Sequence, residues 1–121
     1  MLILQSVLKG DHGIAQRHFA VPEIKGVFDL TADQLNAAFR REAPKLAGRA
    51  LAAALARAGI AATDLDALLI CTCTGYLCPG ITSYVAEQLG LRSNAFLQDI
   101  VGLGCGAAIP SLRAASHIVG T

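Results

Sequence analysis

The sequence has little charge, and the charge that it has is nearly balanced. Only 16% of its 121 residues are charged, whereas a typical soluble domain has about 25%. With a net charge of +1, it has no basic surface of the kind that binds nucleic acid or anionic membranes. No apolar run approaches the roughly 18 residues that a membrane-spanning helix needs, and no basic secretory leader is evident. These absences predict a cytoplasmic protein that binds neither nucleic acid nor a membrane.

The shortage of charge is greatest between Ile60 and Leu112. The charged residues of this stretch are Asp64, Asp66, Glu87, Arg92 and Asp99. A free domain of this size has most of its residues near the surface and would carry more charge there. We therefore expect much of the stretch to be buried, either inside a larger fold or against a partner.

Polar residues mark the beginning of a long helix. Thr31 and Gln34 have the spacing of a capping box, in which each side chain accepts a hydrogen bond from the other residue's backbone N–H. Apolar residues, many of them alanines, recur at helical spacing over residues 35–55, and Gly59 is placed to end the helix. Because Pro44 has no N–H, we expect it to kink or divide this helix.

Two strands and two further helices are predicted downstream. The run Asp66–Thr74 suits a buried strand, Ile81–Leu89 a short helix, Asn94–Val101 a second strand, and about Gly106–Val119 a final helix. This alternation implies an α/β fold in which helices cover a parallel or mixed sheet, as a single domain over residues 1–121.

The clearest chemistry lies in the segment Gly102–Gly106 (GLGCG), between the second strand and the final helix. There Cys105 is expected on a tight turn at a helix N-terminus, where the flanking glycines let a substrate approach. The helix dipole and the unpaired N–H groups favour the thiolate, and the same N–H groups can stabilise an oxyanion. The pattern is the cysteine counterpart of a nucleophile elbow. The alternative is a small cysteine packed between strand and helix.

The same glycines also fit a dinucleotide-binding fingerprint. Residues 102–107 read G-x-G-x-x-A after a strand and before a helix. That fingerprint normally follows the first strand of its domain, and the acidic residue expected about 20 positions later falls beyond residue 121. A Rossmann module is therefore the weaker interpretation.

The other cysteines raise the question of a metal site. Cys71, Cys73 and Cys78 read C-x-C-x4-C, with Cys105 and His117 downstream, and the first two would share one face of a strand. Because neither a C-x2-C knuckle nor paired histidines accompany them, we expect packing roles and no metal. A disulfide is not expected without an export signal.

A nucleophilic cysteine usually needs a base, and the candidates are His12, His18 and His117. His117 lies twelve residues along the same predicted helix as Cys105, which corresponds to about 18 Å. His12 and His18 belong to a segment that the sequence alone does not place. The chain thus offers a nucleophile without an evident partner.

Several segments together resemble the chalcone and stilbene synthases, the type III polyketide synthases. They are Gly13-Ile14 with Arg17-His18, Cys71–Gly75, Pro79-Gly80, Leu89–Leu91, Gly104-Cys105 and Leu112-Arg113. The resemblance implies a thiolase-like fold of layered α-β-α-β-α type, of which this chain is an incomplete N-terminal half, truncated at both ends. It also implies a homodimer.

The resemblance implies that Cys105 takes up an acyl group from acyl-coenzyme A. Malonyl-coenzyme A would then be decarboxylated and attack the bound thioester, with coenzyme A thioesters as substrates and no separate cofactor. Cys73 and Thr74 would line the acyl cavity, and the Cys78–Pro79 bond would be cis in a loop directed at the dimer mate. The family's catalytic histidine and asparagine lie in a second half that these residues do not include. A ketoacyl synthase III and a non-catalytic dimerising remnant are the alternatives.

Overall fold

The computed structural model describes residues 18–20 and 25–120 in two compact units, Met1–Leu30 and Thr31–Thr121. In the first unit the described residues include a 3-10 helix, η1 (Lys25–Asp29). The resemblance at Gly13–Arg17 and the candidate base His12 lie outside the described residues. Within residues 18–20 and 25–120, no helix is long and apolar enough to cross a membrane.

The second unit begins with the long helix α2 (Ala32–Ala58). The predicted capping box is present: the Thr31 N–H donates to Gln34 Oε1 at 2.8 Å, and the Gln34 N–H donates to Thr31 Oγ1 at 3.3 Å. Gly59 ends the helix in the left-handed conformation, at φ 66°. The expectation that Pro44 could divide the helix was wrong, because α2 is one element with Pro44 inside it. A proline removes only one hydrogen bond, and the strong helix formers on both sides maintain the others.

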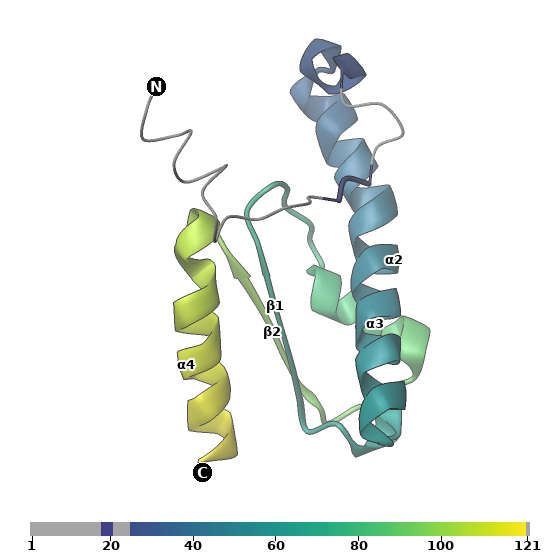
Figure 1. Ribbon diagram of the computed structural model, residues 1–121, viewed down its shortest axis with the longest axis vertical. Helices are drawn as coiled ribbons and strands as arrows, with labels where there is room; N and C mark the ends of the chain where they lie inside the picture. Colours follow the sequence, from purple (N-terminus) through teal and green to yellow (C-terminus); the bar gives the residue numbers. More distant parts are fainter. Residues whose placement is uncertain (1–17, 21–24, 121) are drawn as a thin grey trace, which may run out of the picture. The chain divides into compact units, whose positions relative to one another are not determined.

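The sheet has two parallel strands, β1 (Ala67–Thr72) and β2 (Phe96–Val101). Figure 1 shows α2 and α3 (Ile81–Leu89) on one side of the strands and α4 (Ala108–Val119) on the other. The predicted order and the parallel pairing are confirmed, but both strands are shorter than expected. The ladder ends at the pair Thr72 and Val101, so Cys73 lies beyond β1 and shares no strand face with Cys71. The physical reason is that the backbone turns away at Gly102 and leaves Cys73 without a strand partner.

The core lies between the sheet and the two helices α2 and α3. Its buried residues are Leu68 of β1 and Ile81 and Val85 of α3, and half-buried apolar side chains of α2 pack against them. Gly48 of α2 is buried, and a Cβ at that position would press into the Gln88 side chain of α3. The small residues of α2 therefore allow the close approach of the two helices.

A carboxylate of β2 caps α3. The N-cap residue Gly80 has no side chain to do so, but Asp99 reaches the first turn of the helix from the neighbouring strand. The Thr82 N–H donates to Asp99 Oδ1 at 3.3 Å, and the Thr82 hydroxyl donates to Asp99 Oδ2. Thr82 is only 2% exposed, and a Cβ on Gly80 would overlap the carboxylate. Asp99 therefore supplies the acceptor for buried polar groups and joins β2 to the start of α3.

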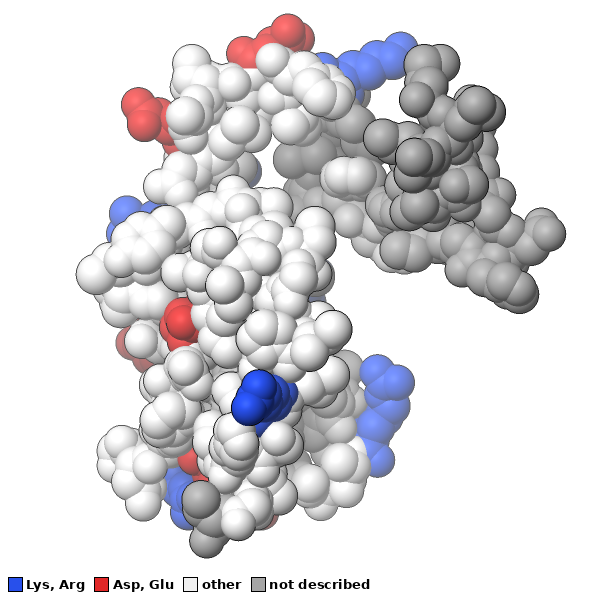
Figure 2. Space-filling model, turned by 90° about the vertical axis from the view of Figure 1, so that its left-hand side faces the viewer, with Lys and Arg blue, Asp and Glu red and all other residues white. Residues whose placement is uncertain are grey.

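Much of the charge-poor stretch is exposed in the second unit, so the burial expected for it does not occur within these residues. The large apolar side chains that are exposed in this region are Ile60, Tyr76, Phe96, Leu97, Val101, Leu103, Ile109 and Leu112. On α4, Ile109 and Leu112 are 78% and 72% exposed. Figure 2 shows that most of the surface on this side is uncharged, with isolated blue and red groups among the white. An apolar surface of this kind suits contact with further polypeptide.

Asp99→Ala is expected to lower the free energy of unfolding by about 1–3 kcal/mol, because it leaves buried donors of Thr82 without an acceptor. Asp99→Asn keeps one carbonyl oxygen and should cost less. Urea denaturation followed by circular dichroism measures both. Asp64→Ala removes an exposed carboxylate on η2 (Ala62–Asp64) and serves as the matched control. Equal stability of Asp99→Ala and the wild type would contradict the capping role.

Candidate functional site

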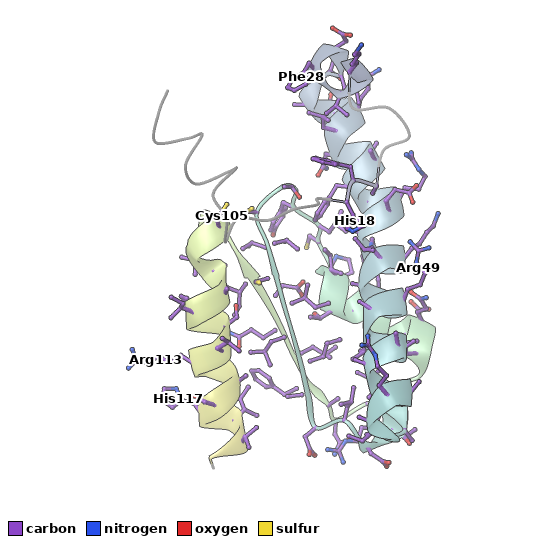
Figure 3. The ribbon with its side chains drawn as sticks, in the orientation of Figure 1. His18, Phe28, Arg49, Cys105, Arg113 and His117 are labelled. Carbon is purple, nitrogen blue, oxygen red and sulfur yellow. The ribbon has the colours of Figure 1, made fainter. Side chains whose placement is uncertain are left out.

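The turn that carries Cys105 is a sharp bend from strand to helix. β2 ends at Val101, and Gly102 and Gly104 then adopt positive φ values of 83° and 58°, which side chains with a Cβ rarely tolerate. A short 3-10 helix, η3 (Gly104–Ala107), follows and leads directly into α4. The predicted bend is confirmed, but the α-helix begins at Ala108, so Cys105 lies in the 3-10 turn that precedes it. Figure 3 shows Cys105 at the end of α4 that lies beside the strands' carboxyl ends.

The side chain of Cys105 is exposed and not packed in the core. It lines a shallow cavity of about 210 Å³. The other residues of its wall are Cys71, Thr72, Cys73, Gly104, Ala107 and Ala108. The alternative of a small cysteine buried between strand and helix is therefore wrong. That position belongs to Ala107, which is 4% exposed.

The structure divides the predicted site residues between two cavities. Cys73 lines the Cys105 cavity. Cys78 lines a different one, of about 310 Å³, together with residues of α2, α3 and β2 that include Phe39 and Asp99. Thr74 is exposed and lines neither of the two. The Cys78–Pro79 peptide bond is cis, as the resemblance implies.

Sequence reasoning missed Thr72, which lines both cavities. Thr72 is the last residue of β1 and pairs with Val101, the last residue of β2. A polar residue that ends a buried apolar run is the signal that could have identified it, since functional side chains gather at the carboxyl ends of parallel strands.

No base faces Cys105 among the residues that line its cavity. Apart from the three thiols, that wall has no titratable side chain. His117 is exposed, and Figure 3 shows it several turns along α4 from Cys105. His117 is not among the residues that line the Cys105 cavity. Any base for Cys105 must therefore come from elsewhere.

In residues 18–20 and 25–120, no group of three or more His, Cys, Asp or Glu side chains could hold a metal ion. The four cysteines are free and exposed. Cys73 and Cys78, which are close together in the sequence, line separate cavities.

The sequence of this chain is similar to those of known proteins. The family model for FAE1/type III polyketide synthase-like proteins matches residues 5–121. A 1,3,6,8-tetrahydroxynaphthalene synthase of Streptomyces peucetius subsp. caesius is 36% identical over 100 residues, which cover 79% of this chain and 26% of that protein. A beta-ketoacyl-[acyl-carrier-protein] synthase III of Streptomyces avermitilis is 34% identical over 108 residues, 88% of this chain and 28% of that protein.

The fold also has a counterpart among solved structures. The crystal structure of CsyB complexed with CoA-SH matches with a TM-score of 0.67 and 29% identity, over 71% of this chain and 23% of the CsyB chain. The thiolase-like α/β fold expected from the resemblance is therefore confirmed. The chain spans about a quarter of the length of the curated relatives that it matches.

Cys105 is expected to react with iodoacetamide faster than Cys71 at neutral pH, because it lies on the exposed η3 turn between Gly104 and Gly106, whereas Cys71 lies within the β1 ladder. Trypsin cleavage after Arg92 and Arg113 separates the Cys105 peptide from that of Cys71, so mass spectrometry can follow both rates in one sample. Unfolding in urea should remove the difference. If both thiols react equally fast in the folded protein, the turn does not activate Cys105.

Proposed function

The chain belongs to the FAE1/type III polyketide synthase-like family, and from that membership we propose that Cys105 accepts the acyl group of an acyl-coenzyme A. The observation that carries the proposal is the position of Cys105: an exposed thiol on a strand-to-helix bend, at the wall of a cavity. We also propose that residues 1–121 correspond to part of the nucleophile-bearing N-terminal half of such an enzyme.

The first step is thiol–thioester exchange. The Cys105 sulfur attacks the thioester carbonyl carbon, and a tetrahedral intermediate forms with negative charge on oxygen. The first N–H groups of a helical segment have no acceptor within it, so those at the start of η3 can donate to this oxygen. The carbon–sulfur bond to coenzyme A then breaks. The coenzyme A thiolate leaves and takes up the proton that Cys105 gave up.

The second step is decarboxylative condensation with malonyl-coenzyme A. Loss of carbon dioxide leaves a carbanion equivalent, which attacks the Cys105 thioester and forms a new carbon–carbon bond. The cavity wall supplies no histidine or amide side chain for this step. Decarboxylation would therefore depend on residues in the remainder of a complete synthase. Coenzyme A thioesters are substrates in this scheme, and neither a metal nor a further cofactor takes part.

The same family membership also suggests roles for Cys73, Thr74 and Cys78. Cys73, in the wall beside Cys105, would contact the bound acyl group. Thr74 and Cys78 would line the acyl cavity of an assembled homodimer, where a partner could complete walls that the described residues leave open. The exposed apolar side chains of β2 and α4 favour assembly with further polypeptide.

A ketoacyl synthase III is the second candidate, because one relative of that name is 34% identical over 88% of this chain. Both enzyme types would begin with acylation of Cys105. They differ in the extender: a type III polyketide synthase uses malonyl-coenzyme A directly, whereas the alternative uses a malonyl group on an acyl carrier protein. The identity of the accepted extender distinguishes them.

Incubation of the chain with acetyl- or hexanoyl-coenzyme A is expected to acylate Cys105. The Cys105 peptide should gain the mass of the acyl group and lose it again in neutral hydroxylamine, which cleaves thioesters. Cys105→Ser should abolish the modification, whereas Cys71→Ser, which changes another thiol of the same wall, should leave it in place. Equal acylation of Cys71 and Cys105 would contradict a specific acyl-loading role.

Condensation is expected only when the remainder of a synthase is supplied. The chain alone should not decarboxylate malonyl-coenzyme A, because the wall around Cys105 has no candidate group for that step. Mixing with a polypeptide that contains the other three quarters of a family member should produce carbon dioxide release, measured with labelled malonyl-coenzyme A. A stable complex that still shows neither acyl transfer nor decarboxylation would favour a non-catalytic dimerising remnant.

A further inference from the structure

Three thiols converge on one small cavity. Cys71 in β1, Cys73 just after it and Cys105 in η3 make up nearly half of the residues that line the Cys105 cavity. They come from segments more than thirty positions apart in the sequence, which the parallel pairing of β1 with β2 brings together. All of them are free and exposed to solvent. If Cys105 is oxidised, other thiols in the wall of the same cavity are therefore available to react with it.

We propose that Cys73 is the resolving thiol for Cys105, so that mild oxidation links the two in a reversible disulfide. Of the two other thiols in this wall, Cys73 is the better placed to approach Cys105, because the strand ladder does not hold its backbone. Cys71 is held within the strand ladder opposite Ile100, whereas Cys73 lies past the last pair, Thr72 and Val101. Cys78 lines the other cavity. This role is separate from acyl transfer and does not require it.

Hydrogen peroxide can supply the oxidising equivalents for this disulfide. The Cys105 thiolate attacks one peroxide oxygen, the oxygen–oxygen bond breaks, and a sulfenic acid and hydroxide form. The Cys73 sulfur then attacks the Cys105 sulfur, a sulfur–sulfur bond forms, and water leaves with the sulfenic oxygen. Two thiols have supplied two electrons, and the peroxide has been reduced to water. A thiol reductant reverses the link.

The consequence is protection of the nucleophile. A sulfenic acid without a neighbouring thiol is oxidised further to sulfinic and sulfonic acids, which common thiol reductants do not restore. A disulfide with Cys73 stops the sequence at the reversible stage. Disulfides in cytoplasmic proteins are usually of this transient kind.

To test this proposal, the reduced 121-residue chain is treated with hydrogen peroxide. The thiols that remain are then blocked with N-ethylmaleimide, and the tryptic peptides are analysed without reduction. Cleavage after Arg57, Arg92 and Arg113 puts Cys105 on one peptide and Cys71, Cys73 and Cys78 on another. We expect these two peptides to be linked within a single chain, and the mass of that chain to fall by two hydrogen atoms. Tandem mass spectrometry identifies the linked residues.

Matched cysteine variants decide the partner. Cys73→Ser should lose the link, while Cys71→Ser and Cys78→Ser should retain it. After peroxide, dithiothreitol should restore iodoacetamide labelling of Cys105 in the wild type, but in Cys73→Ser a fraction should remain blocked as sulfinic acid. Circular dichroism checks that each variant folds, and Cys73→Ala replaces Cys73→Ser if the serine variant does not.

Three outcomes would overturn the proposal: a link from Cys105 to Cys71 or Cys78, a link only between separate chains, or equal recovery of Cys105 in the wild type and Cys73→Ser. Acylation of Cys105 by acyl-coenzyme A is measured on the reduced chain without peroxide. Failure of the redox proposal and failure of the proposed acyl transfer are therefore distinguished.

Discussion

The parallel pairing of β1 with β2 is the constraint on which the rest of the second unit depends. Its register ends both strands at the same level, with Thr72 opposite Val101. The segments that follow the two strands therefore begin side by side. One contains Cys73, and the other turns through Gly102 and Gly104 into η3 with Cys105. A shift of one residue would move every side chain of a strand to the other face and separate these thiols.

The contact between Asp99 and Thr82 extends this constraint to α3. Asp99 belongs to β2, yet its carboxylate fills the place of a missing N-cap side chain at the start of α3. The strand that leads to Cys105 and the helix that follows the cis-proline loop are thereby held together. The larger cavity lies at this junction, with Asp99 and Cys78 in its wall. The two cavities share Thr72, so the geometry of both depends on where β1 ends.

Composition and structure give different information about burial. The low charge between Ile60 and Leu112 led to the expectation of a buried stretch, but these residues alone leave apolar side chains of β2 and α4 exposed. A residue's type reflects its environment in the assembly for which the sequence was selected, and not in one chain by itself. The match to relatives about four times as long agrees with this view. The exposed surface is the part that assembly with further polypeptide would cover.

The sequence by itself determined the local features of this protein. The capping box at Thr31, the helix end at Gly59, the order of strands and helices and the bend at Cys105 all follow from interactions between near neighbours in the chain. Only the tertiary structure decided which residues share a cavity and that Cys73 lies beyond the end of the strand. It also decided that Asp99 caps a helix in another segment and that α2 continues through Pro44. These depend on strand register and on packing between distant segments, because hydrogen bonds and contacts far apart in the sequence outweigh local preferences.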